Sequence, residues 1–365
     1  MINPRSPRYN CKLGRYTIAC EHTIYKNIGE MFGLPCVAKG LNLTERATLL
    51  RTQWDSFEDP VYVGGDASRF DQHTGKLPLE FEHAVLREHY KGDKYLKWLQ
   101  RAQLYNLMYG RTKDGKMRAV LGAMRMSGDM NTALGNCIIT SAMIWMRIER
   151  LGIRAYAIVD GDDSGVIMER ADLGRYMEGA AEYFLQYGYT MQLEEPVDVF
   201  EKISFCQTQP VWVGEGWRMV RDPRRALNND YAGYHQCKST QYVKSLFHSI
   251  GSAGLSLCSG VPVMQSFYSM GMRIGSPSRK NRLIEMQLGG WHQMSRLEAK
   301  RKASVVSNDT RVSFYRAFGM APHTQVALER HFDSLAFSFD VQQAPGFHQE
   351  LLSTTALPIA DEAIC

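Results

Sequence analysis

The sequence lacks the features that mark small, repetitive or membrane-spanning proteins. Its eight cysteines are scattered, with no Cys-x-x-Cys pair and no zinc-finger spacing, so neither a disulfide framework nor a structural zinc site is indicated. Tandem repeats and low-complexity tracts are absent, which excludes a solenoid. The longest strongly apolar stretch, Cys137 to Met146, is about half the length that a bilayer span requires. We therefore expect reduced thiols, no membrane span and a compact fold.

Size and charge narrow the class of protein further. The chain has 365 residues, of which 44% are apolar and 11% aromatic, enough to bury a large core. Residues 1–20 hold four basic side chains and no acid, and residues 331–365 hold five acids and no Lys or Arg. Without that acidic tail the formal charge rises from +5 to +10. This charge suits a polyanionic partner, although a surface bias explains it equally well.

The apolar pattern predicts an α+β fold, in which a mixed, largely antiparallel sheet is flanked by helices. Acids stand at the tip of one predicted hairpin, in Asp160-Gly161-Asp162-Asp163-Ser164. Beyond about residue 230 the pattern becomes mainly helical. The expected strands are 61–65, 155–159, 165–168, 202–207 and 211–213, and the expected helices are 79–90, 137–150 and 173–187.

Two acids stand at the ends of predicted strands far apart in the sequence. Asp66 closes one strand, and Asp162 lies in the hairpin almost a hundred residues later. A single Asp at a strand end is commonly only a turn residue. If these strands pair in one sheet, however, their carboxylates meet, and nucleotidyl transfer needs hard oxygen ligands for two divalent ions about 4 Å apart.

Three short patterns occur in a fixed order. They are Asp-x-x-x-x-Asp at 66–71, Ser-Gly-x-x-x-Thr-x-x-x-Asn at 127–136, and Gly-Asp-Asp at 161–163. Together they resemble palm motifs A, B and C of positive-strand RNA virus polymerases. The wording DASRFDQH and SGDMNTALGN is similar to the tombusvirus group in particular, and ISFCQTQP at 203–210 resembles motif E of that group.

The resemblance implies an RNA-directed RNA polymerase with Mg²⁺ as cofactor and Mn²⁺ as its substitute. Asp66 and Asp162 would ligate metal, with Asp163 supporting the second ion or the primer end. Four polar side chains would surround the incoming ribose and read its 2′-hydroxyl. These are Asp71, Ser127, Thr132 and Asn136. The alternative for these four is local capping, with Asn136 as the N-cap of a helix that begins at Cys137.

The basic N-terminal segment resembles motif F, which lies over the entering nucleotide. Arg15 would contact the triphosphate, because a guanidinium matches phosphate oxygens bidentately. Arg5, Arg8 and Lys12 would line the same entry channel for RNA and nucleotide. A solvated basic face is the alternative. In the stretch that matches motif D, Met191, Gln192 and Leu193 stand where related polymerases often have a lysine, so the general acid is unassigned; Lys202 is a candidate for it only if the chain folds it inward.

The resemblance also implies a right-hand architecture. The expected parts are partial fingers at 1–60, a palm at 61–215 with a fingers insertion around 72–126, a helical thumb at 216–330 and an acidic tail at 331–365. Partners would be RNA template and product, ribonucleoside triphosphates, and viral or host replication proteins. The enzyme would work in the host cytoplasm, in membrane-associated replication complexes.

The sequence around the acids also bears on two other possible functions. A reverse transcriptase is disfavoured because Asp160-Gly161 precedes the paired acids where an aromatic residue is usual. It also usually has a bulky side chain near the ribose, where this sequence has the small, polar Asp71 and Asn136. A catalytically incomplete RNA-binding replicase fragment is the alternative function. We expect the chain to lack upstream fingers, and residues 1–20 therefore to be mobile for want of packing partners.

Overall fold

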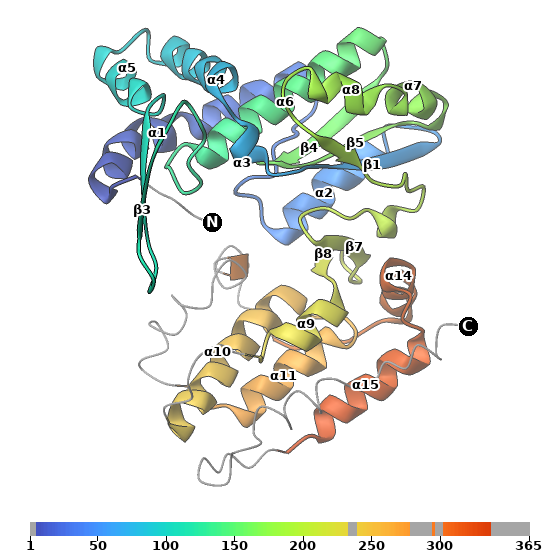
Figure 1. Cartoon of the computed structure of the whole chain (residues 1–365). Helices are drawn as coiled ribbons and strands as arrows, with labels where there is room; N and C mark the ends of the chain where they lie inside the picture. The colour runs from blue at the N-terminus through green and yellow to red at the C-terminus, as the bar shows by residue number, and fades with distance from the viewer. Residues whose placement is uncertain (1–4, 233–238, 278–293, 296–301, 337–365) are drawn as a thin grey trace. The chain divides into compact units, whose positions relative to one another are not determined.

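The computed structural model describes the whole chain except residues 1–4, 233–238, 278–293, 296–301 and 337–365. The chain divides into two compact units. The first unit contains residues 1–40 and 49–199, and the second contains residues 41–48 and 200–365 (Figure 1). The helix α2 (Leu43–Trp54) begins in the second unit and ends in the first.

A four-stranded antiparallel sheet lies at the centre of the first unit. Its strand order is β4-β5-β1-β6, so that β1 sits between the acidic hairpin and the last strand. The strands are β1 (Pro60–Ala67), β4 (Ala155–Asp160), β5 (Asp163–Glu169) and β6 (Met191–Leu193). The strands expected at 61–65, 155–159 and 165–168 are thereby confirmed, as is their pairing in one sheet.

The helices of this unit pack around that sheet. They are α1 (Pro7–Phe32), α3 (Phe70–His73), α4 (Lys76–His89), α5 (Lys94–Arg101), α6 (Thr132–Leu151), α7 (Leu173–Met177) and α8 (Ala180–Leu185). A short 3₁₀ turn, η1 (Arg170–Asp172), follows β5. The helix expected over 79–90 is confirmed. The single helix expected over 173–187 is instead two short helices, separated at Glu178 and Gly179.

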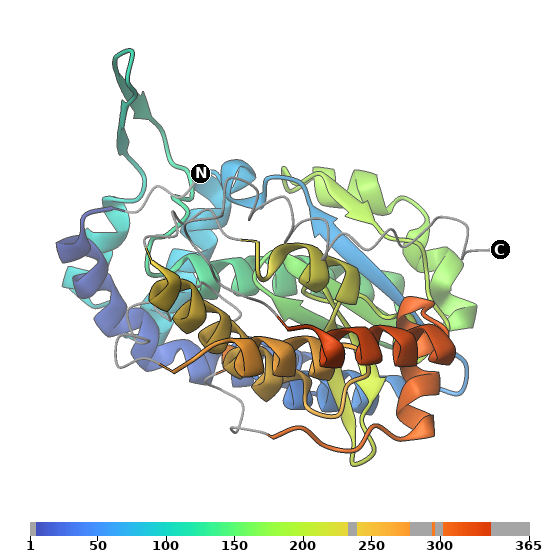
Figure 2. The same cartoon turned by 90° about the horizontal axis from the view of Figure 1, so that it is seen from below.

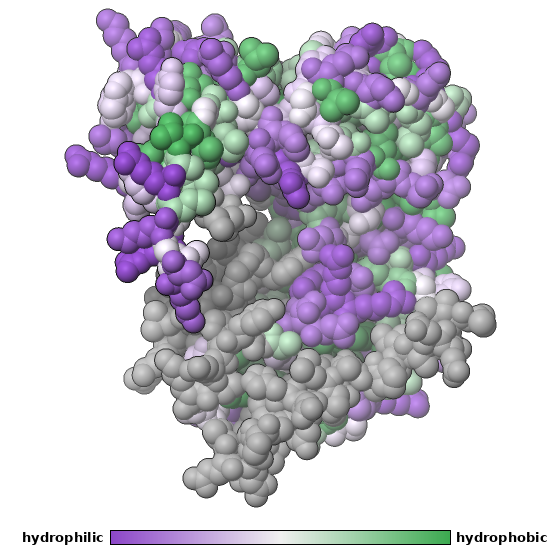
Figure 3. All heavy atoms as spheres, in the orientation of Figure 1, coloured by the Kyte–Doolittle hydropathy of each residue, from purple (hydrophilic) through white to green (hydrophobic). Residues whose placement is uncertain are grey.

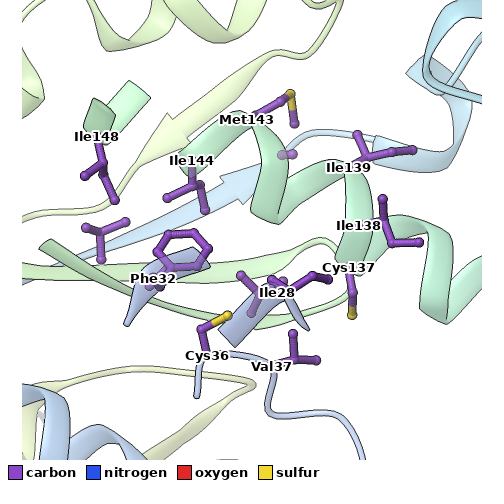
Figure 4. Close-up of a cluster of buried hydrophobic side chains, with 14 of the residues drawn as sticks. Ile28, Phe32, Cys36, Val37, Cys137, Ile138, Ile139, Met143, Ile144 and Ile148 are labelled. Carbon is purple, nitrogen blue, oxygen red and sulfur yellow. The ribbon is translucent and has the colours of Figure 1, made fainter. Parts of the chain in front are cut away.

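The core of the first unit lies between α6, α1 and the sheet (Figure 4). From α6, Ile144 and Ile148 face Phe32 of α1, and all three are at most 8% exposed. The segment that follows α1 runs beside β4, because Val37 forms a parallel bridge with Val159. This packing fixes α6 against the strand that leads into the acidic hairpin.

The expectation that residues 1–20 lack packing partners is wrong for the described residues 5–20. They enter α1, whose first turn is capped by the Ser6 side chain accepting from Tyr9 N–H. Leu13, Thr17 and Cys20 are each at most 1% exposed. Their spacing of three and four residues gives α1 an apolar face that the rest of this unit covers.

A two-stranded hairpin of the first unit projects from its body (Figure 2). It consists of β2 (Asn106–Arg111) and β3 (Lys116–Leu121), and we call residues 105–121 the arm. Its strands belong to neither of the other sheets.

The second unit contains a small antiparallel pair and several helices. They are η2 (Phe200–Lys202), β7 (Thr208–Trp212), β8 (Trp217–Arg221), α9 (Pro223–Asn229), α10 (Thr240–Cys258), α11 (Met264–Ile274), α14 (Asn308–Phe318) and α15 (Pro322–Ser334). The expected pairing of 202–207 with 211–213 is wrong. Cys206 and Gln207 have positive φ values and form a turn before β7, so the pair begins later.

The helical character expected beyond residue 230 is confirmed for the described residues. The acidic tail expected from residue 331 begins inside α15, and its remainder from 337 lies outside the described residues. The two units meet in the sequence at 199 and 200, while the boundaries expected for fingers, palm and thumb remain predictions. Among the helices that the structure describes, none is both long and apolar enough to cross a bilayer.

Candidate active site

Three carboxylates gather at one end of the central sheet. Gly65 pairs with Ser164, and continuing the antiparallel register by one residue sets Asp66 beside Asp163. Asp163 in turn pairs with Asp160, which leaves Gly161 and Asp162 as the tip of the hairpin. The register thus brings together the three acids that the sequence singled out.

The hairpin tip depends on Gly161. This residue has φ of 86°, a conformation that glycine adopts without strain and that other residues rarely adopt. Its N–H donates to Cys137 Sγ of α6 over 3.2 Å, which ties the turn to the helix. The orientation of Asp162 is therefore set by α6 as well as by the strands.

The carboxylates at this edge repel one another. The pKa of Asp162 is raised, first because neighbouring protein displaces water from its charged form, and then because Asp71 and Asp66 are close. Lys39 acts in the opposite direction on the same pKa, and its Nζ lies 2.9 Å from Asp160 Oδ1. Extra negative charge is thus concentrated where a divalent cation would relieve it.

Glu194 is a fourth acid at this edge, and the sequence patterns did not indicate it. It follows β6, and its N–H donates to Gly64 O of β1 over 2.9 Å. The pKa of Glu194 is raised, first by loss of solvent and then by repulsion from Asp66 and Asp163. Lys39 was missed as well. Only the pairing of distant segments brings these two residues to the site, so no local pattern could have identified them.

The oxygen-rich donor set suits a hard divalent cation such as Mg²⁺. Within the described part of the chain, however, no three His, Cys, Asp or Glu side chains are already arranged closely enough to hold a metal ion. The fit to metal therefore rests on the chemistry and mutual repulsion of Asp66, Asp162 and Asp163 at one sheet edge.

Asp71 links two other residues that the sequence placed around the ribose. Ser127 Oγ donates to Asp71 Oδ2, and Asn136 Nδ2 donates to Asp71 Oδ1 over 2.9 Å. Asn136 is 3% exposed, and its Oδ1 has no hydrogen-bond partner. A buried amide oxygen without a partner can accept a hydrogen bond from a hydroxyl.

The capping interpretation of Asn136 is wrong. The helix α6 begins at Thr132, with Asn131 as its N-cap, so Asn136 lies in the second turn. The polar run before Cys137 was expected to be loop because it contains Gly135 and few apolar residues. In the structure Thr132 Oγ1 donates to Met126 O over 3.2 Å, so Thr132 shapes the preceding loop.

A buried ion pair holds the loop that precedes α6. Arg125 and Glu82 are 3% and 0% exposed and are joined by a salt bridge. Asn131 Nδ2 donates to Glu82 Oε1 over 2.6 Å, which fixes the start of α6 to α4. A Cβ on Gly135 would lie 2.3 Å from Glu82 Oε2, so a larger residue there would have to displace this buried ion pair.

The basic residues of the N-terminal segment divide into two groups. Arg5 is bound to Asp129 and to Asn106, so it holds structure together. Arg8 and Arg15 are exposed, and Lys12 lies over the Tyr95 ring at 5.7 Å from its centroid. Arg8 and Arg15 are seven residues apart and thus share a face of the helix.

Comparison with known proteins places the chain in a family. The family model for viral RNA dependent RNA polymerase matches residues 1–340, well beyond the segment that carries the motifs. RNA-directed RNA polymerase of tobacco necrosis virus (strain A) is 40% identical over 343 residues, which are 93% of this chain and 47% of that protein. Those of carnation mottle virus and tomato bushy stunt virus (strain Cherry) are 39% and 36% identical over 93% and 90% of this chain, and 44% and 40% of their own lengths.

The chain thus spans less than half the length of these curated relatives. The match over nearly the whole of this chain includes both units. The chain therefore belongs to the viral RNA-dependent RNA polymerase family.

Proposed function

We propose that this chain catalyses template-directed synthesis of RNA from ribonucleoside triphosphates and so replicates a viral RNA genome. The observation that carries the proposal is the meeting of Asp66, Asp162 and Asp163 at one sheet edge, coupled by repulsion to Asp71. A catalytically incomplete RNA-binding fragment would explain the basic charge, but it needs none of these acids in this arrangement. RNA template, RNA product and nucleoside triphosphates are the proposed partners, with viral or host replication proteins in addition.

Asp66 and Asp162 would hold two Mg²⁺ ions, which Mn²⁺ can replace, and Asp163 would support the second ion. When bound, these ions would lower the pKa of the attacking 3′-hydroxyl and neutralise charge on the triphosphate. The strands β1 and β5 hold Asp66 and Asp163 on rigid backbone, and Gly161 allows the turn that has Asp162 at its tip. The protein's own contribution is thus orientation of the reacting groups, which supplies much of the rate enhancement in reactions of this type.

Asp71, Ser127 and Asn136 would select ribose. Asn136 Oδ1 is buried and unpaired, so a 2′-hydroxyl that donates to it would satisfy an acceptor that a deoxyribonucleotide leaves empty. Thr132 would act on the ribose through the shape of the loop. Arg15, with Arg8 and Lys12 beside it, would contact the triphosphate or the RNA at the entrance.

The right-hand architecture belongs to the same proposal. The central sheet with its acids would be the palm, residues 1–60 and the insertion around 72–126 the fingers, and the helices after about 215 the thumb. Work in the host cytoplasm, within membrane-associated replication complexes, stays a prediction.

The proposal is tested by nucleotide incorporation on an RNA template with Mg²⁺ or Mn²⁺. The chain should extend RNA in a template-dependent manner, and Asp162→Asn should not. Equal incorporation by both proteins would refute the proposed metal site. Absence of incorporation by either protein, together with intact RNA binding, would favour the incomplete fragment.

A further inference from the structure

The arm carries two chemically different faces. In an antiparallel pair, residues that lie opposite each other point to the same side of the ribbon, and successive residues alternate between the two sides. The pairs on one side are Leu107 with Val120, Tyr109 with Arg118, and Arg111 with Lys116. The pairs on the other side are Asn106 with Leu121, Met108 with Ala119, and Gly110 with Met117. All the cations and the aromatic ring of the two strands are therefore on one side, which we call the basic face.

The basic face is open to solvent. Tyr109 is 67% exposed and Val120 is 79% exposed, and Arg111, Lys116 and Arg118 are also exposed. The Arg118 guanidinium lies over the Tyr109 ring, 5.8 Å from its centroid. Tyr105, at the root of the arm, is 82% exposed. The free end of the arm is hydrophilic in Figure 3.

Charge on the arm has one dominant sign. Residues 105–121 contain Arg111, Lys113, Lys116 and Arg118, against the single acid Asp114. Exposed cations are not needed to hold a projecting hairpin together, and an aromatic ring exposed to water carries a free-energy cost. Cations that alternate with exposed rings match a ligand that has both phosphates and unstacked bases.

We infer that the basic face of the arm binds single-stranded RNA, with Tyr109 stacking on a base and Arg111, Lys116 and Arg118 contacting phosphates. A duplex is a poorer match, because its bases are hidden from an aromatic ring and the major groove of an RNA helix is too deep and narrow to admit a ribbon. The site lies outside the carboxylate edge, and the inference depends on the proposed function only for the choice of RNA as the polyanion.

The dimensions fit a short stretch of strand. Leu107 and Arg111 are four residues apart on β2, which at about 3.3 Å per residue spans about 13 Å. A stacked strand advances about 3.4 Å per nucleotide, so the basic face covers about four nucleotides. The turn keeps this ladder intact to its end, since Thr112 N–H donates to Gly115 O over 2.9 Å.

The base of the arm is held firmly relative to the candidate active site. Asn106 Nδ2 donates to Gly122 O over 2.7 Å, which closes the two ends of the arm on each other. Arg5 donates to Asn106 and to Asp129, and Asp129 belongs to the same loop as Ser127. An RNA strand bound on the arm would thus keep a fixed relation to the loop that contacts Asp71.

The experiment measures binding of a fluorescent single-stranded RNA of about 12 nucleotides, within the range that single-strand sites cover, at several salt concentrations. Arg111→Ala/Lys116→Ala should weaken binding about tenfold. It should also reduce the slope of log affinity against log salt concentration by about 1.4, since each phosphate contact on a single strand contributes about 0.7 to that slope. Tyr109→Ala should weaken binding by about fivefold or more, and Tyr109→Phe should bind as the unchanged protein does.

Controls separate this site from bulk charge and from the catalytic proposal. Lys97→Ala/Arg150→Ala removes two exposed cations from helices of the same unit and should leave affinity within about twofold, as expected for charges without a phosphate contact. Asp162→Asn should lose incorporation while its binding of RNA, including the effect of the arm variants, is kept. Melting curves would verify that each variant is folded.

Three results would overturn the inference. The first is unchanged affinity and salt slope in Arg111→Ala/Lys116→Ala, and the second is an equal loss in the Lys97→Ala/Arg150→Ala control. The third is that the arm variants lose binding to a duplex of the same length as much as or more than binding to single-stranded RNA, or lose binding to vesicles of anionic lipid while single-stranded RNA binding stays intact. The arm would then recognise negative charge and not a single strand.

Discussion

Asn136 Nδ2 donates to Asp71 Oδ1 over 2.9 Å, and the Oδ1 of the same Asn136 amide is buried without a partner. Asp71 therefore fixes which end of the amide donates and which end is left as the acceptor. Ser127 completes the arrangement by donating to the other oxygen of Asp71. Because Asp71 accepts a hydrogen bond from each of them, it orients Ser127 and Asn136 before any nucleotide binds.

Asn136→Ala and Asp71→Ala should weaken discrimination between ribonucleotides and deoxyribonucleotides by about tenfold or more. The first change removes the side chain proposed to bind the 2′-hydroxyl, and the second removes the carboxylate that orients that side chain. The measurement is the incorporation ratio for matched nucleotide pairs. Thr140→Ala is the control, since Thr140 lies one turn farther along α6, is 0% exposed and has an unpaired hydroxyl. An unchanged ratio in both Asn136→Ala and Asp71→Ala would return these residues to a purely structural role.

Arg15→Ala should raise the apparent KM for nucleotide by about tenfold with a smaller effect on template affinity, since it would lose a phosphate contact. Arg5→Ala should behave differently. Arg5 is bound to Asp129, whose side chain is 1% exposed, so its loss should lower the melting temperature. If Arg15→Ala instead changes template affinity and its salt slope while KM stays the same, Arg15 contacts RNA and not the triphosphate.

Gly135→Ala should destabilise the protein by about 2 kcal/mol or more, although alanine normally favours a helix over glycine by about 1 kcal/mol. The added Cβ would lie 2.3 Å from Glu82 Oε2 and 2.4 Å from Arg125 Nη2 and would push apart a buried ion pair. Gly174→Ala is the matched control, because nothing lies within 4 Å of its Cβ. Chemical denaturation gives both values, and an equal effect of the two changes would contradict the close packing at Gly135.

Stability should fall as the pH drops from about 7 to about 5, in part through His83. The pKa of His83 is lowered, first by burial, against an opposing effect of Glu82, and Arg125 and Arg87 lower it further. A lowered pKa means that the unfolded chain takes up the proton first, so the contribution is present above the ordinary pKa of 6.5 and is lost below it.

His83→Gln keeps a polar partner for Gln103, to which His83 Nε2 is bonded at 2.9 Å, and removes the titration. The loss of stability between pH 7 and 5 should therefore be smaller in His83→Gln than in the unchanged protein. The comparison uses melting temperatures at each pH, and identical pH profiles would show that His83 does not contribute.

Local patterns in the sequence identified what strands and short motifs determine by themselves. The run at 61–65 is rich in β-branched and aromatic residues, and the hairpin tip has Gly161 where its turn needs positive φ. Because β1 and β5 pair, the meeting of Asp66 with Asp162 and Asp163 followed from three local signals.

Contacts between distant segments account for what the sequence did not indicate. α6 begins at Thr132, five residues before the expected start, because Asn131 is held by Glu82 of α4 and the polar first turns are thereby buried. Glu194 and Lys39 reach the carboxylate edge only through strand pairing along β1 and β4. The spacing of Leu13 and Cys20 already indicates the apolar face of α1, but residues 1–20 were expected to be mobile because no upstream fingers were expected to pack against them.

We propose above all that the acids at the sheet edge are metal ligands of a polymerase. The most direct measurement is template-dependent nucleotide incorporation, with RNA binding measured alongside it. It compares the unchanged chain with Asp162→Asn, Asp66→Ala and the control Asp198→Asn, which alters an exposed acid of the same unit. We expect Asp162→Asn and Asp66→Ala to lose incorporation by roughly a thousandfold or more while RNA binding is kept, because a lost ligand misplaces a metal that lowers much of the barrier. Asp198→Asn should keep its activity. More than about a tenth of the unchanged activity in both Asp162→Asn and Asp66→Ala would show that these acids are not the metal ligands of a polymerase.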